Sequence, residues 1–289
     1  MPYTPGAVLD GLGASLGALR LGAVDDTGVA WIFQTLDGWD SPDIRSEFSE
    51  REGDHGAWAS PVYLGARPLT LAGTIVAPSR DLLDQAMERL QAAAGLGDTV
   101  LTVWESRPKQ AVVRRSGKLL IQYVTDTTAT YSVMVTAADP RRYSTTLQTG
   151  STLLPSTSGG LAPPLTPPLT STAETVQGQI TAFNEGTFET KPVLIVDGPV
   201  VAPQILVQMP DASVVFLNYS ETLGEGEQLV IDTDAHSVIL NGNASRRRFL
   251  TLPTGWPTIP AGAVVTFQFR SSSMNSTAQL TIRWRSAWL

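Results

Sequence analysis

Short stretches rich in β-branched and aromatic residues, separated by Gly and Pro, dominate the first half of the chain. Such stretches are typical of β-strands bounded by turns. We expect strands at residues 29–36, 62–75, 99–104, 118–124 and 130–136. The first half therefore predicts at least one β-sheet with several short connections.

One segment of the first half has a different period. Apolar residues recur at helical spacing from Leu82 to Ala94, which predicts one amphipathic helix. Ser79 can cap its first turn by accepting a backbone hydrogen bond, and Asp81 suits the positive end of the helix dipole. Gly95 is expected to end the helix. The apolar stripe should pack against the sheet as part of a core.

The second half shows strand patterns only. Apolar and polar residues alternate in 265–270 and 280–285, as in a half-buried antiparallel strand. Residues 227–232 and 236–240 look like two arms of a hairpin across a turn at 233–235. Several short strands at regular spacing predict a β-sandwich.

A boundary between the two halves is expected at residues 148–172. This range contains Ser- and Thr-rich stretches and the duplicated Pro-Pro-Leu-Thr at 163–166 and 167–170. Proline removes a backbone donor and fixes φ, so a helix or central strand should not run through it. We therefore expect domains at 1–147 and 173–289 joined by an extended linker. A long surface loop within one domain is the alternative.

Composition removes several classes of function. The 289 residues contain no Cys and two His, which excludes thiolate sites and a His-rich metal site. The net charge is −7, so a surface that grips DNA is disfavoured. Met1 to Leu12 lacks the features of a signal peptide, and no apolar run is long enough to span a bilayer. We expect no membrane insertion.

Candidate catalytic residues have simpler explanations. Asp232 and Asp234 are close enough to suggest a carboxylate pair, but they fall in an expected turn, where Asp is favoured for backbone reasons. His236 follows them, yet adjacency along a strand is not the geometry of a triad. The glycines from Gly11 to Gly17 do not have dinucleotide-loop spacing and predict a flexible loop. We expect no catalytic residue, no metal site and no cofactor.

Tryptophan 256 is the one residue considered for ligand binding. Trp256 lies in a Pro-rich loop at 253–260, where an exposed indole could stack on a sugar. Trp284 instead matches the apolar phase of its strand and is expected in the core.

The most informative segment is a charged loop between two apolar strands. It runs from Gly38 to Arg45 and continues from Glu50 to Trp58, and it is dense in Gly, Asp and Arg. Long loops within compact domains are usually functional. Alternating acids and arginines would suit docking to a neighbouring subunit through complementary charges.

Four segments in order resemble the phage distal tail protein family, the siphovirus tail component often called Dit, in the versions found in phages of actinobacteria. They are residues 38–56, the strand at 61–75, the helix that follows it, and Ala138-Asp139-Pro140-Arg141-Arg142-Tyr143. Residues 229–233 and 238–242 resemble the second domain of the family. The resemblance covers most of the chain, and its order and spacing carry more weight than any one segment.

The resemblance implies a mainly β chain: a tail-tube-like β-sandwich with one flanking α-helix, then a galectin-like or jelly-roll β-sandwich. It implies a non-enzymatic virion protein at the tip of a long non-contractile tail, assembled in the host cytoplasm. Six copies would form a ring that joins the tail tube protein to the tail hub, with tape-measure and receptor-binding proteins as further partners. DNA would pass only as cargo, along an acidic or neutral face.

In a closed ring, each subunit presents two different faces to its neighbours. Our candidates for that contact are Arg45, Arg51, Asp54, His55 and Trp58. The alternative function is a carbohydrate-binding module or a minor tail protein that contacts the host cell envelope.

Overall fold

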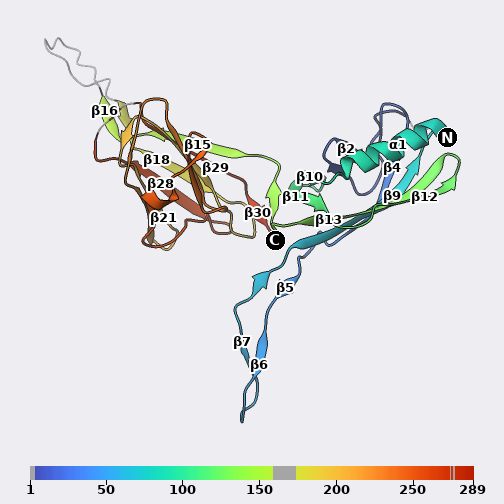
Figure 1. Cartoon of the computed structure of the whole chain (residues 1–289), viewed down its shortest axis with the longest axis horizontal. Helices are drawn as coiled ribbons and strands as arrows, with labels where there is room; N and C mark the ends of the chain where they lie inside the picture. The colour runs from blue at the N-terminus through green and yellow to red at the C-terminus, as the bar shows by residue number, and fades with distance from the viewer. Residues whose placement is uncertain (1–3, 159–173, 274, 276) are drawn as a thin grey trace, which may run out of the picture. The chain divides into compact units, whose positions relative to one another are not determined.

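The computed structural model describes residues 4–158, 174–273, 275 and 277–289 (Figure 1). The chain divides into two compact units, Met1–Thr145 with Leu289, and Thr146–Trp288. We call them the first and the second domain. The expected fold class is confirmed: the described residues are mainly β, in several sheets, with one α-helix beside the sheet of the first domain.

A curved, antiparallel sheet forms the first domain, in the order β2-β1-β10-β11-β13-β9-β4-β3, with β12 beside β13 and β14 beside β11. The strands are β1 (Ala14–Leu16), β2 (Leu19–Leu21), β3 (Ala23–Val24), β4 (Ala30–Asp37), β9 (Arg67–Val76), β10 (Thr99–Val103), β11 (Lys109–Arg115), β12 (Leu120–Thr125), β13 (Thr128–Ala137) and β14 (Arg142–Ser144). Alternate residues of β9 and β13 are buried, so their inner faces carry the core.

The predicted helix is α1 (Arg80–Ala93). Ser79 caps it as expected, because its side chain accepts a hydrogen bond from the Leu82 amide at 3.4 Å. The helix buries Leu83, Ala86, Met87 and Leu90 in the same core as the sheet. It ends just before Gly95, as expected: the Ala94 amide closes the last turn on the Leu90 carbonyl, although Gly95 does not adopt positive φ.

The loop expected at Gly11–Gly17 is instead the start of β1, which pairs with β2 and β10. The glycines on both sides suggested a loop, but the three residues between them form a strand. Ala14 and Leu16 are buried, and Ser15 between them is partly exposed. Strand β11 was also not expected. β1 pairs with β10, which is far away in sequence, whereas β11 forms a hairpin with β10, the strand just before it.

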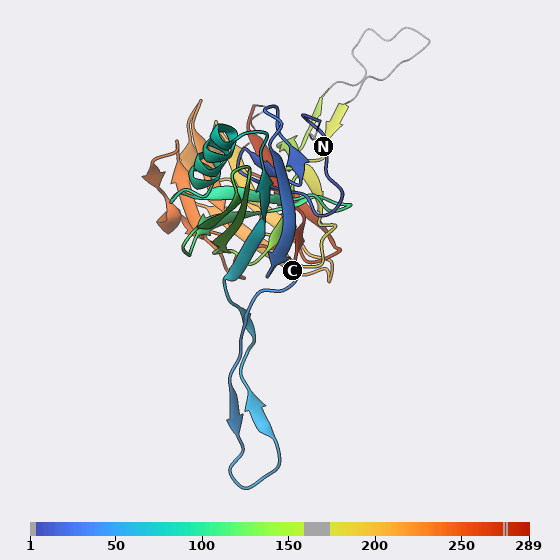
Figure 2. The same ribbon diagram turned by 90° about the vertical axis from the view of Figure 1, so that its right-hand side faces the viewer.

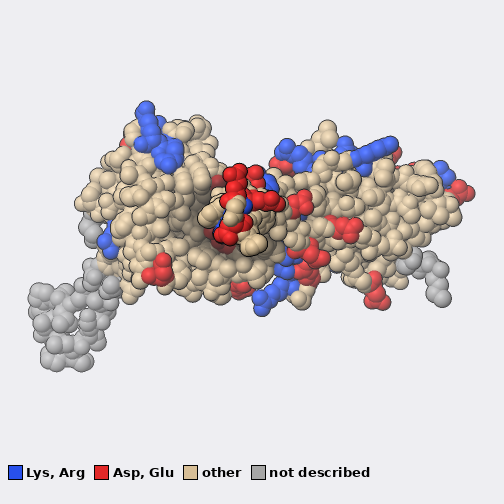
Figure 3. Space-filling view, turned by 90° about the horizontal axis from the view of Figure 1, so that it is seen from below, with Lys and Arg blue, Asp and Glu red and all other residues tan. Residues whose placement is uncertain are grey.

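The outer face of the first-domain sheet is uncharged across β9, β13 and the adjoining parts of β4 and β12. Register places these side chains there: Ile32, Gln34, Thr70, Ala72, Thr74, Leu120, Gln122, Thr130, Ser132, Met134 and Thr136. Charged residues lie on this face only near strand ends, where Asp37 is opposite Thr70 and Arg114 is opposite Thr136. The face opposite α1 is correspondingly mostly tan in Figure 3. We call this set the hydroxyl face.

A two-stranded arm leaves the first domain between β4 and β9 (Figures 1 and 2). It consists of β5 (Ile44–Arg45), β6 (Phe48–Glu50), β7 (Ala57–Ala59) and β8 (Tyr63–Leu64). β5 pairs with β8 and β6 pairs with β7. We call residues 43–65 the arm. The strand expected at 62–75 is therefore split, since its first residues belong to the arm and only Arg67–Val76 joins the sheet.

The second domain is a sandwich of a six-stranded sheet, β15-β29-β19-β24-β25-β26, and a five-stranded sheet, β18-β28-β21-β22-β27. Its elements are β15 (Gln148–Leu153), β16 (Ser156–Ser158), β17 (Glu174–Val176), β18 (Gln179–Phe183), β19 (Val193–Asp197), β20 (Val200–Val201), β21 (Gln204–Gln208), β22 (Val214–Tyr219), β23 (Thr222–Leu223), β24 (Gln228–Asp232), β25 (Ser237–Leu240), β26 (Ala244–Ser245), η1 (Arg247–Phe249), β27 (Leu250–Thr251), β28 (Val264–Arg270), β29 (Gln279–Trp284) and β30 (Ala287–Trp288). Phe267, Phe269 and Trp284 lie in its core, as the alternation predicted.

The range expected as a linker, 148–172, needs a correction at its start. Residues 148–153 form β15, which pairs with β29 over its whole length, and residues 156–158 form β16. A strand is possible there because the prolines begin only at Pro155, so every residue from 148 to 153 keeps its backbone donor. The duplicated Pro-Pro-Leu-Thr lies outside the described residues.

Candidate subunit-interface arm

The arm is held together almost entirely by its own backbone. The Gly65 amide donates to the Asp43 carbonyl at 2.7 Å near the root, and the Arg51 amide donates to the Gly56 carbonyl at 3.1 Å near the tip. Gly53 and Gly56 both have positive φ, which suits a tight tip. A two-stranded ribbon without a covering layer is marginally stable in water. The arm therefore needs contacts from outside its own strands.

Large apolar side chains on the arm are exposed. Five of them expose more than 60% of their surface: Ile44, Phe48, Trp58, Val62 and Tyr63. A cluster of this kind on a protruding element marks an interaction surface. The arm is therefore the strongest candidate for a functional site in the described residues.

The arm is also acidic. Between residues 43 and 65, five carboxylates stand against two arginines, which gives a local charge of −3. Figure 3 looks toward the arm and shows acidic side chains gathered there. An acidic, apolar surface would suit a partner that carries cations beside apolar groups.

The two faces of the arm differ in chemistry. Side chains alternate along a strand, so Phe48 and Glu50 lie on one face of β6. Trp58 pairs with Ser49 and lies on the other face, where the Arg51 guanidinium sits 4.4 Å from the centre of its ring. This cation–π contact organises the second face.

All five residues expected at a subunit contact lie on the arm. Arg45 Nη2 donates to the Leu64 carbonyl at 3.4 Å, and Arg51 Nη1 lies 3.9 Å from Asp54 Oδ2. The His55 amide donates to Asp54 Oδ1 at 2.7 Å, within the tip. Trp58 follows in β7. The structure thus brings the five together on one element, and their role in a contact stays a prediction.

Arg67 anchors the root of the arm. Its side chain is fully buried. Nε donates to the Pro140 carbonyl at 2.9 Å, and Nη1 donates to the carbonyls of Gly38 at 3.0 Å and Trp39 at 2.6 Å. Burial, with Arg142 nearby, lowers the pKa of Arg67 to about 10, against the opposing effect of Asp40 and Asp139. Arg67 remains a cation at neutral pH.

A second set of contacts fixes the buried Trp39 beside this root. Trp39 Nε1 donates to Glu105 Oε1 at 2.5 Å, and Glu105 also pairs with Lys109. The Arg142 guanidinium lies 5.5 Å from the centre of the Trp39 ring. Burial would raise the pKa of Glu105, but hydrogen bonds from Lys109 and Trp39 outweigh it and hold that pKa below its ordinary value. Glu105 is therefore ionised.

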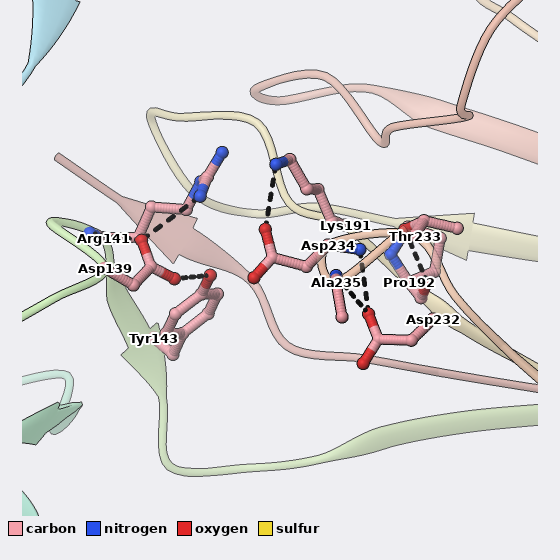
Figure 4. Close-up of polar contacts among 9 residues, drawn as sticks. All are labelled: Asp139, Arg141, Tyr143, Lys191, Pro192, Asp232, Thr233, Asp234 and Ala235. Carbon is pink, nitrogen blue, oxygen red and sulfur yellow. Dashed lines mark hydrogen bonds and ion pairs between the residues drawn. The ribbon is translucent and has the colours of Figure 1, made fainter. Parts of the chain in front are cut away.

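Three of the segments that suggested the family meet at Arg67: residues 38–39, the strand that contains Arg67, and residues 138–143. Within the last segment, Asp139 accepts hydrogen bonds from Arg141 at 3.2 Å and from Tyr143 at 2.5 Å (Figure 4). Sequence reasoning noted these segments but did not single out Arg67 or Glu105. Two features of the sequence could have pointed to them: an Arg within an otherwise apolar strand, and a Glu directly after another apolar strand.

The residues considered for catalysis form a turn in the second domain. Asp232 Oδ1 accepts from the amides of Asp234 and Ala235, both at 2.9 Å (Figure 4). Asp234 pairs with Lys191 at 2.9 Å, and the Thr233 hydroxyl donates to the Pro192 carbonyl. His236 takes positive φ as the hairpin turns into β25. The predicted turn chemistry is confirmed, because Asp232 is used to close the turn.

Trp256 is partly buried against the second-domain core. His236 stacks on its ring, with centroids 4.8 Å apart, and the Arg247 guanidinium lies 5.0 Å from the ring centre. A sugar would have to compete with these contacts. The binding role expected for Trp256 stays a prediction.

Within the part of the chain that the structure describes, no three or more His, Asp or Glu side chains are grouped to hold a metal ion. No helix in that part has the length and apolar character to cross a membrane.

Comparison with known proteins relates part of the chain to a known family. Residues 185–288 match the family model of the siphovirus-type tail component, C-terminal domain. The matched range lies within the second domain, which is therefore similar to that tail component domain. This match confirms the resemblance to the distal tail proteins that the sequence suggested. Comparison with the curated proteins found no match.

Two solved phage structures share the fold over nearly the whole chain. The Dit protein (gp 19.1) of phage SPP1, described as a paradigm of the hub adsorption apparatus in phages that infect Gram-positive bacteria, is 13% identical, with a TM-score of 0.61 over 89% of this chain and 93% of that one. A chain of the phage P2 baseplate in its activated conformation with Ca is 10% identical, with a TM-score of 0.50 over 94% and 97%. The agreement extends to the first domain.

Proposed function

We propose that this protein is a structural component at the distal end of a long non-contractile phage tail, where copies of its first domain form a ring. The ring, with six copies in our proposal, joins the tail tube protein to the tail hub and the receptor-binding apparatus. The protein assembles in the host cytoplasm and then remains at the virion tail tip. The tail component match of the second domain supports this role.

The arm is the observation that carries the ring. The arm exposes five large apolar side chains and has only a two-stranded ladder to hold it. In a single chain this surface therefore lacks a packing partner. A ring closes when one surface of each subunit meets a different surface of the next. The arm supplies one such surface, with Arg45, Arg51, Asp54, His55 and Trp58 among its contacts.

The hydroxyl face supports a passage for DNA. DNA is a polyanion, so cations on a channel wall would hold it by releasing its counterions. The hydroxyl face instead offers short hydroxyl, amide and apolar side chains with no charge at its centre. We infer that this face lines the passage and that DNA is transient cargo. The protein acts by assembly, and we assign it no catalytic residue.

Loss of two arm side chains tests the proposal. The variant Phe48→Ser with Trp58→Ser removes apolar surface that is about two-thirds exposed at each position, so the fold should be kept while assembly is lost. Mass photometry of the full chain should show rings for the parent protein and single chains for the variant. A parent protein that stays monomeric, both alone and with its tail partners, would reject the ring.

Phe183→Ser is the matched control. Phe183 is 43% exposed, but it lies on the second domain. This variant should assemble like the parent. Circular dichroism of all variants should be the same, since none of the changed side chains belongs to a core.

A further inference from the structure

A hollow of about 450 Å³ opens on the first domain, between the C-terminal half of α1 and the connection from β11 to β12. Leu119 and Ile121 form an apolar floor that packs on the domain core. Arg115 and Lys118 stand at its rim, and the lining includes no carboxylate. The hollow therefore suits a ligand that combines an apolar group with an acid.

The two cations of this hollow are unused. Among the ion pairs of the described residues, none includes Arg115 or Lys118. The neighbouring Arg114, in contrast, pairs with Asp98 at 2.8 Å. Unpaired cations beside apolar surface favour an anionic partner.

A larger hollow of about 780 Å³ lies beside β2 and α1, but its chemistry is different. Asp25, Asp26 and Asp98 are part of its wall. Of its two cations, Arg89 is already paired with Asp25 at 2.8 Å, and the Arg20 guanidinium lies 5.8 Å from the centre of the Trp104 ring. An acidic ligand would meet carboxylates there, so the smaller hollow is the better match.

The arm carries the complementary set. Phe48 is 66% exposed and shares a face of β6 with Glu50. Among the described residues, no ion pair includes Glu50 or Glu52. An aromatic ring and a carboxylate on one face correspond to the apolar floor and the cationic rim of the hollow.

We propose that the Phe48 and Glu50 face of the arm of one copy docks into the Arg115 and Lys118 hollow of a neighbouring copy. Phe48 lies on Leu119 and Ile121, and Glu50 lies between the two cations. This inference rests on the proposed ring and names the surface that receives the arm. Because arm and hollow are different surfaces, the contact is head-to-tail, as a ring requires.

Charge reversal on each side tests this pairing in the full chain. Glu50→Lys and Lys118→Glu each place like charges together, so each should raise the concentration needed for half assembly by about tenfold or more. The double variant restores opposite charges with the two sides exchanged, and it should assemble like the parent. Mass photometry over a dilution series gives these concentrations.

An equimolar mixture of the two single variants adds a second test. Both kinds of contact in the mixture join opposite charges, so rings should form from chains that do not assemble alone. Glu225→Lys in the second domain and Arg107→Glu in the first are the matched controls, since both side chains are exposed and outside the proposed contact. Both controls should assemble normally.

Different failures have different meanings. Parent rings that tolerate both single variants would overturn the docking site and leave the ring intact. Loss of assembly in Arg20→Glu, at the larger hollow, without loss in Lys118→Glu would place the arm elsewhere and overturn the inference. A parent chain that never assembles would reject the ring and this contact together. Rescue by the double variant also shows that the single variants were folded.

Discussion

At the scale of single residues, Arg67 anchors the root of the arm to the first domain. Its guanidinium joins the carbonyls of the adjacent Gly38 and Trp39 to that of Pro140, which is far away in sequence. A lysine could not reach three carbonyls in this planar arrangement. The direction in which the arm leaves the domain therefore depends on one buried side chain.

Replacing Arg67 with Met should leave these three carbonyls without their donor. Each buried carbonyl left unpaired costs about 1–3 kcal/mol, so we expect a loss of at least about 3 kcal/mol in the free energy of unfolding. Urea denaturation measures that loss, and hydrogen exchange at the Gly65 amide should become faster. Arg20→Met, at an exposed position, is the control and should change stability little. Unchanged exchange at Gly65 would contradict the anchoring role.

Glu105 gives the root a pH dependence. Its folded pKa is lowered, so its contribution is present at neutral pH and is lost as the pH falls through that lowered value. Between about pH 5 and pH 3 the parent should lose more stability than Glu105→Gln, because the variant has no charge to titrate. At pH 7 the variant should be less stable by about 1.5 kcal/mol. Denaturation at several pH values measures both, and parallel curves would contradict the role.

Among the elements, α1 depends on its buried stripe. Leu90 is fully buried in the first-domain core, so Leu90→Ala should cost about 2–5 kcal/mol through lost burial and a cavity. Glu88→Ala, on the exposed side of the same helix, should change stability by less than about 0.5 kcal/mol. Thermal and urea denaturation compare the two. Equal effects would show that the helix contributes through propensity rather than through packing.

The elements that the sequence predicted well are those with local signals. The helix has its cap, its dipole residue and its stripe within one short segment, and β28 and β29 show plain alternation. The three-residue strands β1 and β2 were missed because they are too short to show a pattern of their own, and β1 joins the sheet by pairing with the distant β10. β15 was hidden by the prolines that follow it. Arg67 could not be identified, since its partners lie 28 to 73 residues away.

At the scale of the whole molecule, the chain combines two domains with different duties. The second is similar to the C-terminal domain of the siphovirus-type tail component. The first has the arm, the hollow that we propose receives it, and the hydroxyl face. In our proposal each copy gives an arm to one neighbour and receives an arm from the other. We therefore expect single chains and complete rings, with few partial rings, because a partial ring leaves one arm and one hollow empty.

The hydroxyl face has a consequence for genome delivery. Threonine hydroxyls can donate hydrogen bonds to phosphates but carry no charge, so the wall would not release counterions from the duplex as it slides past. The speed of genome exit past this ring should then respond only weakly to added salt beyond the effect of salt on the packed genome itself. Lysines introduced at Thr74 and Thr130 would attract the phosphates of the passing duplex. Phage with that change should eject DNA more slowly in dilute buffer.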